Sequence, residues 1–188
     1  MMNRRGLTLI ELLLALAGTA LVATAIASML SAVSYGTTNS RDLRELAVKN
    51  KALSSRVTAA IRQSAMVLES GSDYLVLWVY DLDGDGTPSV LELQRINYDA
   101  AADTLTSYEP DPAATDTEYD LADDFEAETD ALIAADDLLD ELWATNVTAW
   151  NVTLDDGDAQ AAELLSFRIT LAAGDMTDIA IAAVKLRN

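Results

Sequence analysis

Four carboxylates in the middle of the sequence have the spacing of a calcium-binding loop. The carboxylates are those of Asp81, Asp83, Asp85 and Glu92. The glycine that such a loop requires is Gly86. Together they fit the pattern D-x-[DN]-x-[DN]-G-x₅-E at every specified position. In a loop of this kind the aspartates and the final glutamate supply hard oxygen ligands, and the glycine permits a sharp turn. The sequence therefore predicts Ca²⁺ as a ligand of this segment.

The surroundings of the loop differ from those of an EF-hand. Thr87 could supply the backbone carbonyl of the seventh position, but Pro88 follows it where a branched apolar residue is usual. The flanking residues predict strands, whereas an EF-hand has helices there. Asp-Gly pairs are also common in hairpin turns that bind no metal. Both interpretations stay open, and Glu92 is a ligand only if its strand turns the side chain back toward the loop.

The residues of the common catalytic centres are missing from the chain. Its 188 residues include no Cys and no His, which excludes Ser-His-Asp and Cys-His catalysis and zinc held by imidazole or thiolate. No other group of residues suggests an active site. We therefore expect a protein that is not an enzyme and has no cofactor besides Ca²⁺.

The charges are divided unevenly along the chain. The formal net charge is −19, yet residues 1–68 hold eight basic and three acidic residues, against four basic and 28 acidic residues in 69–188. So acidic a C-terminal part repels nucleic-acid phosphates, and nucleic acid is excluded as a partner. The charge suits solubility, cations or basic partners.

The elements that hold the loop are predicted to be antiparallel strands. The runs 74–80 and 90–98 are rich in β-branched and aromatic residues and flank the loop as a hairpin. The segment 104–108 is predicted to be a short strand. Apolar residues alternate again in the segments 150–154, 165–171 and 179–183, of which the last two form a terminal hairpin.

An acidic insertion interrupts these strands at about 109–143. The segment is rich in alanine and acid, and its first third, with two prolines, could be a loop. The apolar residues of its remainder have the spacing of one helical face from 121 to 143: Leu121, Phe125, Leu132, Leu139 and Leu142.

A long helix is predicted before the strands. Residues 12–33 contain no charge, and their length at about 1.5 Å per residue suits a bilayer core of roughly 30 Å. Beyond them, apolar residues continue at helical spacing to Leu68, with basic residues on the other faces. No proline precedes Pro88, so one helix from 7 to about 68 is expected. The basic face is either solvated or meets the acidic parts of neighbouring molecules.

The start of this helix carries a specific motif, Arg-Arg-Gly-Leu-Thr-Leu-Ile-Glu at residues 4–11. It resembles the type IV prepilin signal (type III signal peptide) of type IV pilins and type II secretion pseudopilins. In that family a prepilin peptidase cuts after the glycine and methylates the new amino terminus. The resemblance implies cleavage between Gly6 and Leu7, N-methylation of Leu7, and pairing of Glu11 with the amine of a neighbouring subunit. Leu7 departs from the phenylalanine that is commonest there.

Other interpretations of the start leave some of its residues unexplained. A secretory signal cleaved near Ala25 would hold Glu11 inside its apolar core. A signal anchor accounts for the two arginines by the positive-inside rule but not for Gly6 or Glu11. Glu11 could also reach the headgroups without further function, although a charge at the centre of a membrane helix costs about 2.5–3.5 kcal/mol and is retained mainly where it has a partner.

The resemblance implies a domain organisation of leader 1–6, transmembrane helix 7–34, amphipathic continuation 35–69 and head 70–188. The expected fold class is α+β, with the long helix packed on an antiparallel sheet as in the lollipop of pilins. Length and head content are similar to those of a minor pseudopilin of the J type or a minor pilin of the W type.

The expected function is that of a minor structural subunit of a type II secretion pseudopilus or type IV pilus. Its expected partners are prepilin peptidase, other subunits and the inner membrane, which it crosses once with its head in the periplasm before assembly. The alternative is a single-pass envelope protein that does not polymerise and whose acidic head binds calcium.

Overall fold

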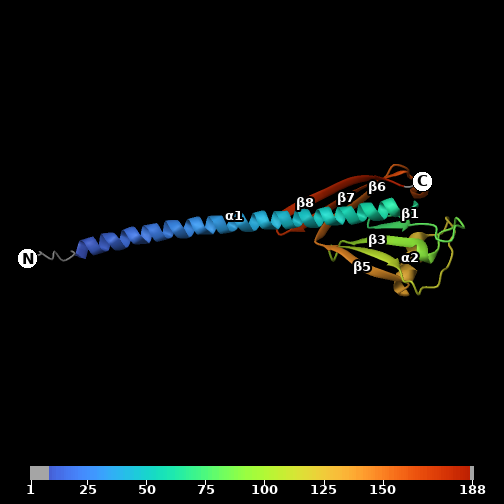
Figure 1. Cartoon of the computed structure of the whole chain (residues 1–188), viewed down its shortest axis with the longest axis horizontal. Helices are drawn as coiled ribbons and strands as arrows, with labels where there is room; N and C mark the ends of the chain where they lie inside the picture. The colour runs from blue at the N-terminus through green and yellow to red at the C-terminus, as the bar shows by residue number, and fades with distance from the viewer. Residues whose placement is uncertain (1–8, 187–188) are drawn as a thin grey trace, which may run out of the picture. The chain divides into compact units, whose positions relative to one another are not determined.

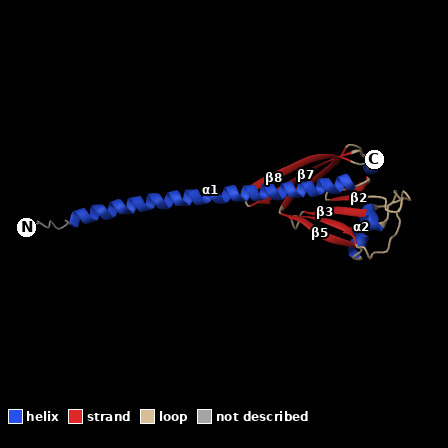
Figure 2. Ribbon diagram, in the orientation of Figure 1, coloured by secondary structure: helices blue, strands red, loops and turns tan. Residues whose placement is uncertain are grey.

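The computed structural model describes the backbone of residues 9–186 and the side chains of residues 9–33 and 42–186. The chain divides into two compact units, Met1–Arg44 and Glu45–Asn188. Helix α1 (Leu9–Gln63) belongs to both and is the first element in Figures 1 and 2. The chain is α+β, with an N-terminal apolar helix and antiparallel sheets, as the sequence predicted in outline.

The first unit contributes an apolar stretch of α1. The segment Leu9–Val33 is long and apolar enough to cross a membrane, and none of it is buried. Its few hydroxyl groups donate hydrogen bonds to carbonyls of the preceding turn, as from Thr19 to Leu16 and from Ser28 to Ala25, both at 2.9 Å. Such bonds satisfy polar groups where no water is present.

In the second unit α1 ends earlier than predicted. The helix stops at Gln63, and Met66–Ser70 form strand β1 rather than its last turn. Val67 and Leu68 are both buried but belong to different apolar clusters. Successive residues of a strand point to opposite faces, so this pair can serve two cores at once. The helical spacing of Leu68 was therefore coincidental.

Within residues 9–186, eight strands form two antiparallel sheets. The larger has the order β1-β2-β3-β4-β5 and the smaller the order β6-β7-β8. The remaining strand bounds are β2 (Tyr74–Trp78), β3 (Leu93–Asp99), β4 (Thr104–Pro110), β5 (Leu138–Thr145), β6 (Val147–Leu154), β7 (Leu164–Ala173) and β8 (Met176–Lys185). The predicted hairpin around the acidic loop and the terminal hairpin are confirmed as β2–β3 and β7–β8.

The predicted helix from 121 to 143 is wrong in its second half. Helix α2 (Phe125–Ala134) is shorter, and β5 pairs with β4 where the helix was expected to continue. Asp136 has a positive φ of 61°, a left-handed conformation that ends the helix. A smaller difference lies after the loop, where a single 3-10 turn, η1 (Val90–Glu92), precedes β3.

Two apolar cores hold the second unit together. The first joins α1 to the larger sheet and to β6–β8; its members include Val57, Leu75, Phe167 and Ile169. The second lies on the other face of the larger sheet, where Phe125 of α2 packs with Val76 and Leu93. Figure 1 accordingly shows β6–β8 on one side of α1, with β3, β5 and α2 on the other. A second short 3-10 turn, η2 (Ala159–Ala161), precedes β7.

Candidate functional sites

The structure describes the predicted assembly residue, Glu11, but not the predicted processing site. Gly6 and Leu7 lie outside the described residues. Glu11 lies in the first turn of α1 and is exposed. It is the only acidic residue of the apolar segment Leu9–Val33.

The structure brings the three aspartates of the acidic loop together. Asp81, Asp83 and Asp85 are exposed, and one carboxylate oxygen of each lies within 4.8 Å of the others. The loop between β2 and η1 bends inward at Gly84 and Gly86, whose φ angles of 79° and 81° favour glycine. Hard carboxylate oxygens gathered in this way fit Ca²⁺, which takes six to eight oxygen ligands.

Hydrogen bonds within the loop fix the directions of these carboxylates. Asp81 accepts from the backbone N–H groups of Gly84 at 2.6 Å and Gly86 at 3.1 Å. Asp85 accepts from the N–H of Thr87 at 2.8 Å and from its hydroxyl at 2.7 Å. These bonds from Thr87 hold the pKa of the Asp85 carboxyl below its usual range, so the group is ionised at neutral pH.

Glu92, the fourth predicted ligand, is engaged elsewhere. Its side chain is buried and accepts hydrogen bonds from the indole N–H of Trp78 at 2.9 Å and from the backbone N–H of Leu82. It also accepts from the N–H of Ser89 at 3.2 Å, completing a capping box on η1. The carboxylate therefore ties the start of the loop to the turn that ends it. The structure does not group its oxygens with those of the three aspartates.

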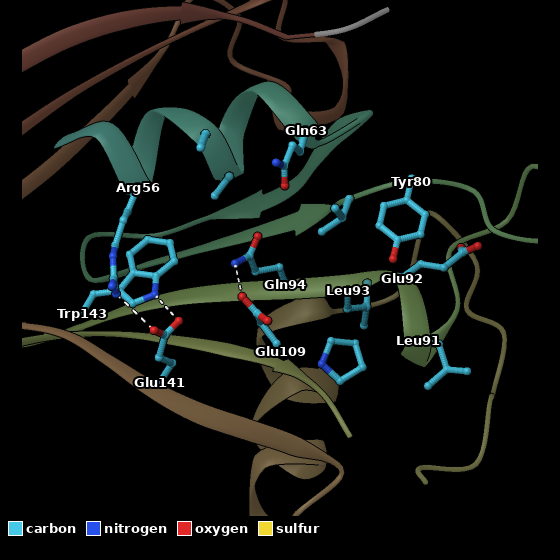
Figure 3. A pocket seen from close by; sticks show the side chains of 14 residues that line it. Arg56, Gln63, Tyr80, Leu91, Glu92, Leu93, Gln94, Glu109, Glu141 and Trp143 are labelled. Carbon is cyan, nitrogen blue, oxygen red and sulfur yellow. Dashed lines mark hydrogen bonds and ion pairs between the residues drawn. The ribbon is translucent and has the colours of Figure 1, made fainter. Parts of the chain in front are cut away.

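A pocket of about 380 Å³ lies between α1 and the larger sheet (Figure 3). Its polar side chains bind one another: Arg56 contacts Glu141 at 3.1 Å, and the Trp143 indole donates to the same carboxylate at 3.0 Å. Gln94 likewise donates to Glu109 at 3.2 Å. The residues that line this pocket include no nucleophile paired with a base, and its groups serve to hold α1 and β5 together.

Sequence reasoning missed the polar cluster that fixes α2 on the sheet. The buried guanidinium of Arg95 contacts Asp130 at 2.5 Å and the Thr129 hydroxyl at 2.9 Å, and lies 5.1 Å from the centre of the Tyr74 ring. The Tyr74 hydroxyl lies 2.8 Å from Glu69 and 3.0 Å from Glu126. Burial, and then these carboxylates, raise the pKa of Tyr74 above its usual value. An arginine within an alternating strand gave no signal that a helix would cover it.

Comparison with protein-family models, with curated proteins and with solved structures gave no match.

Proposed function

We propose that the chain is a subunit of a type IV pilus or of a type II secretion pseudopilus, processed by prepilin peptidase and assembled through its N-terminal helix. The observation that carries the proposal is the position of Glu11, in the first turn of an exposed apolar segment that holds no other acidic residue. A membrane helix retains such a residue mainly where it finds a partner. The amine that cleavage before Leu7 creates is a suitable partner.

The packing of α1 in the second unit also supports the proposal. The last four turns of α1 pack through Leu53, Val57 and Ile61 in a core shared with both sheets. A helix built into a domain at one end, with an apolar segment at the other, suits a subunit that is anchored in a membrane and then withdrawn into a filament. On this proposal the chain crosses the inner membrane once, with its head in the periplasm.

A second candidate function rests on the acidic loop. The grouping of Asp81, Asp83 and Asp85 favours an envelope protein whose head binds calcium and which need not polymerise. The two functions make different demands on Glu11, because only a polymerising subunit needs the carboxylate to meet an amine.

Replacement of Glu11 tests the filament proposal. We expect Glu11→Ala to be cleaved normally but to enter filaments poorly, since the buried amine of Leu7 loses its partner. Glu11→Asp, which keeps the charge on a shorter side chain, is the control and should enter filaments better than the alanine variant. The measurement is the amount of each variant in sheared filaments relative to the membrane fraction. Equal incorporation of Glu11→Ala and wild type would refute the proposed role of Glu11.

A further inference from the structure

The charges of the second unit are separated between its elements. Residues 96–167 contain 20 acidic residues and no basic one. The strands β6, β7 and β8, by contrast, contain a single acidic residue, Asp178. That carboxylate is turned toward α1, where it accepts a hydrogen bond from the buried Asn50 at 2.9 Å. The outward-facing residues of these strands therefore include no carboxylate.

The outer surface of the smaller sheet, here called the β6–β8 face, combines apolar and basic side chains. Ile181 is 72% exposed, and Ile179 and Leu164 are also exposed. Arg168 pairs with Ile181 in the strand register, and Lys185, which lies 3.5 Å from Glu163, pairs with Leu164. Exposed isoleucines on an edge strand are typical of a surface that another chain covers.

The opposite side of the second unit has the complementary composition. Its surface, here called the α2–β5 face, presents one exposed leucine, Leu142, on the same face of β5 as Asp140. It also presents the exposed acidic residues Asp124, Glu126, Asp130, Asp136 and Asp140. Figure 1 shows β6–β8 and the pair α2 and β5 on opposite sides of α1. One molecule thus carries an apolar surface with basic residues on one side and an acidic surface with one exposed leucine on the other.

We propose that the β6–β8 face of one copy of this chain packs against the α2–β5 face of a second copy. The inference rests on the proposed function and names the partner of the head. Because the two surfaces differ, the contact is heterologous, and such contacts repeat from copy to copy and build filaments when they do not close into a ring. The proposal therefore places copies of this chain next to one another, in contrast to the minor subunit that the length and head content suggest.

The size of the β6–β8 face predicts that the contact forms between membrane-anchored copies and not in dilute solution. Strands of ten residues at about 3.3 Å per residue, spaced about 4.8 Å apart, give a face on the order of 400 Å². A stable complex buries about 800 Å² on each partner. The contact is therefore too small to hold two copies in dilute solution, and it requires that membrane helices raise their effective concentration.

Cross-linking of the full chain in membranes tests the contact, because the natural sequence has no cysteine. One tagged copy carries Ile181→Cys, a second copy with a different tag carries Asp140→Cys, and a bismaleimide joins thiols that lie close together. We expect a mixed dimer whose yield falls as salt is raised, since the charges on the two faces are exposed. The control pair, Ile181→Cys with Ala101→Cys in the β3–β4 turn, should give little product.

Charge reversal then tests the complementarity. Arg168→Glu with Lys185→Glu should lower the yield at least about tenfold, because like charges then face each other, whereas Arg168→Lys should leave it unchanged. Equal yields with Asp140→Cys and Ala101→Cys, products between two Ile181→Cys copies alone, or insensitivity to charge reversal would each overturn the contact. The amino terminus is measured in the same samples: a chain matured at Leu7 that gives no mixed dimer refutes the contact and leaves the proposed function standing.

Discussion

Two segments of helix α1 use apolar residues in opposite ways. In residues 9–33 the leucines are exposed, among them Leu13, Leu16 and Leu21. In residues 45–63 the apolar residues Leu53, Val57 and Ile61 are buried against the two sheets. Since burial of such a side chain contributes about 1.5–3 kcal/mol, the second segment finds its apolar surroundings within the described chain. The first segment is not buried against any part of the described chain, and by length and composition it could cross a membrane.

The largest effect is expected where a charge enters the packed segment. Val57→Asp should destabilise the second unit by about 4 kcal/mol or more, because an unpaired carboxylate is buried in its core. The matched control is Val48→Asp on the same helix, where the native side chain is 68% exposed; we expect a change within about 0.5 kcal/mol. Denaturant unfolding of the full chain in detergent, followed by tryptophan fluorescence, measures both. A similar loss in the free energy of unfolding for both variants would contradict the assignment of a buried and an exposed side to this segment.

A charge in the exposed segment should act on the membrane instead of the fold. Ala20→Arg lies within Leu9–Val33 and should cost about 3 kcal/mol on insertion, which lowers the equilibrium constant for insertion about a hundredfold. Ala59→Arg, at an exposed position near the end of α1, should leave insertion unchanged. Resistance to alkaline extraction reports the inserted fraction. If Ala20→Arg remained fully inserted and Ala59→Arg did not, the assignment of the two segments would be reversed.

The acidic loop shows the same contrast between a side chain with partners inside the chain and side chains exposed to solvent. The expected effect on stability is smaller here. Glu92 is satisfied inside the hairpin, whereas Asp81, Asp83 and Asp85 are exposed. Calcium in excess should raise the melting temperature of the second unit by an amount worth about 1–3 kcal/mol, and Asp83→Ala with Asp85→Ala should abolish the rise. Differential scanning calorimetry with calcium and with chelator measures it.

Glu92→Gln sharpens the calcium experiment. We expect it to lower the melting temperature in calcium and in chelator alike, because the hydrogen bonds to Trp78 and Leu82 are weakened whether or not metal is present. A variant that unfolds like wild type in chelator but no longer responds to calcium would instead make Glu92 a metal ligand. Identical melting of the wild type in both conditions would leave the loop as a turn.

The sequence was most informative where one local pattern decides the structure. The charge-free run before Val33, the strands on both sides of the acidic loop and the terminal hairpin could all be predicted from residue periodicity. Each depends on contacts between residues close in the chain. The proximity of the three aspartates in the loop could be predicted for the same reason, because a tight turn brings residues close in the chain together.

Long-range partners decided the elements that the sequence did not predict. Val67 and Leu68 fit a helix until β2 and α2 supply a surface on each side of them. Leu139 and Leu142 fit a helical face, but pairing with β4 makes them part of a strand. The side chain of Glu92 could be placed only once the Trp78 indole was known to face it across the hairpin. The two sheets likewise share one core with α1, which involves residues far apart in the chain.

The amino terminus of the mature protein tests the central claim most directly. The full chain is produced in cells with an active prepilin peptidase, isolated from membranes and weighed by intact mass spectrometry. We predict a chain that begins at Leu7 and carries one methyl group, and we predict that Gly6→Leu remains uncleaved. Wild-type protein that still begins at Met1 in those cells would contradict assignment to a processed filament subunit.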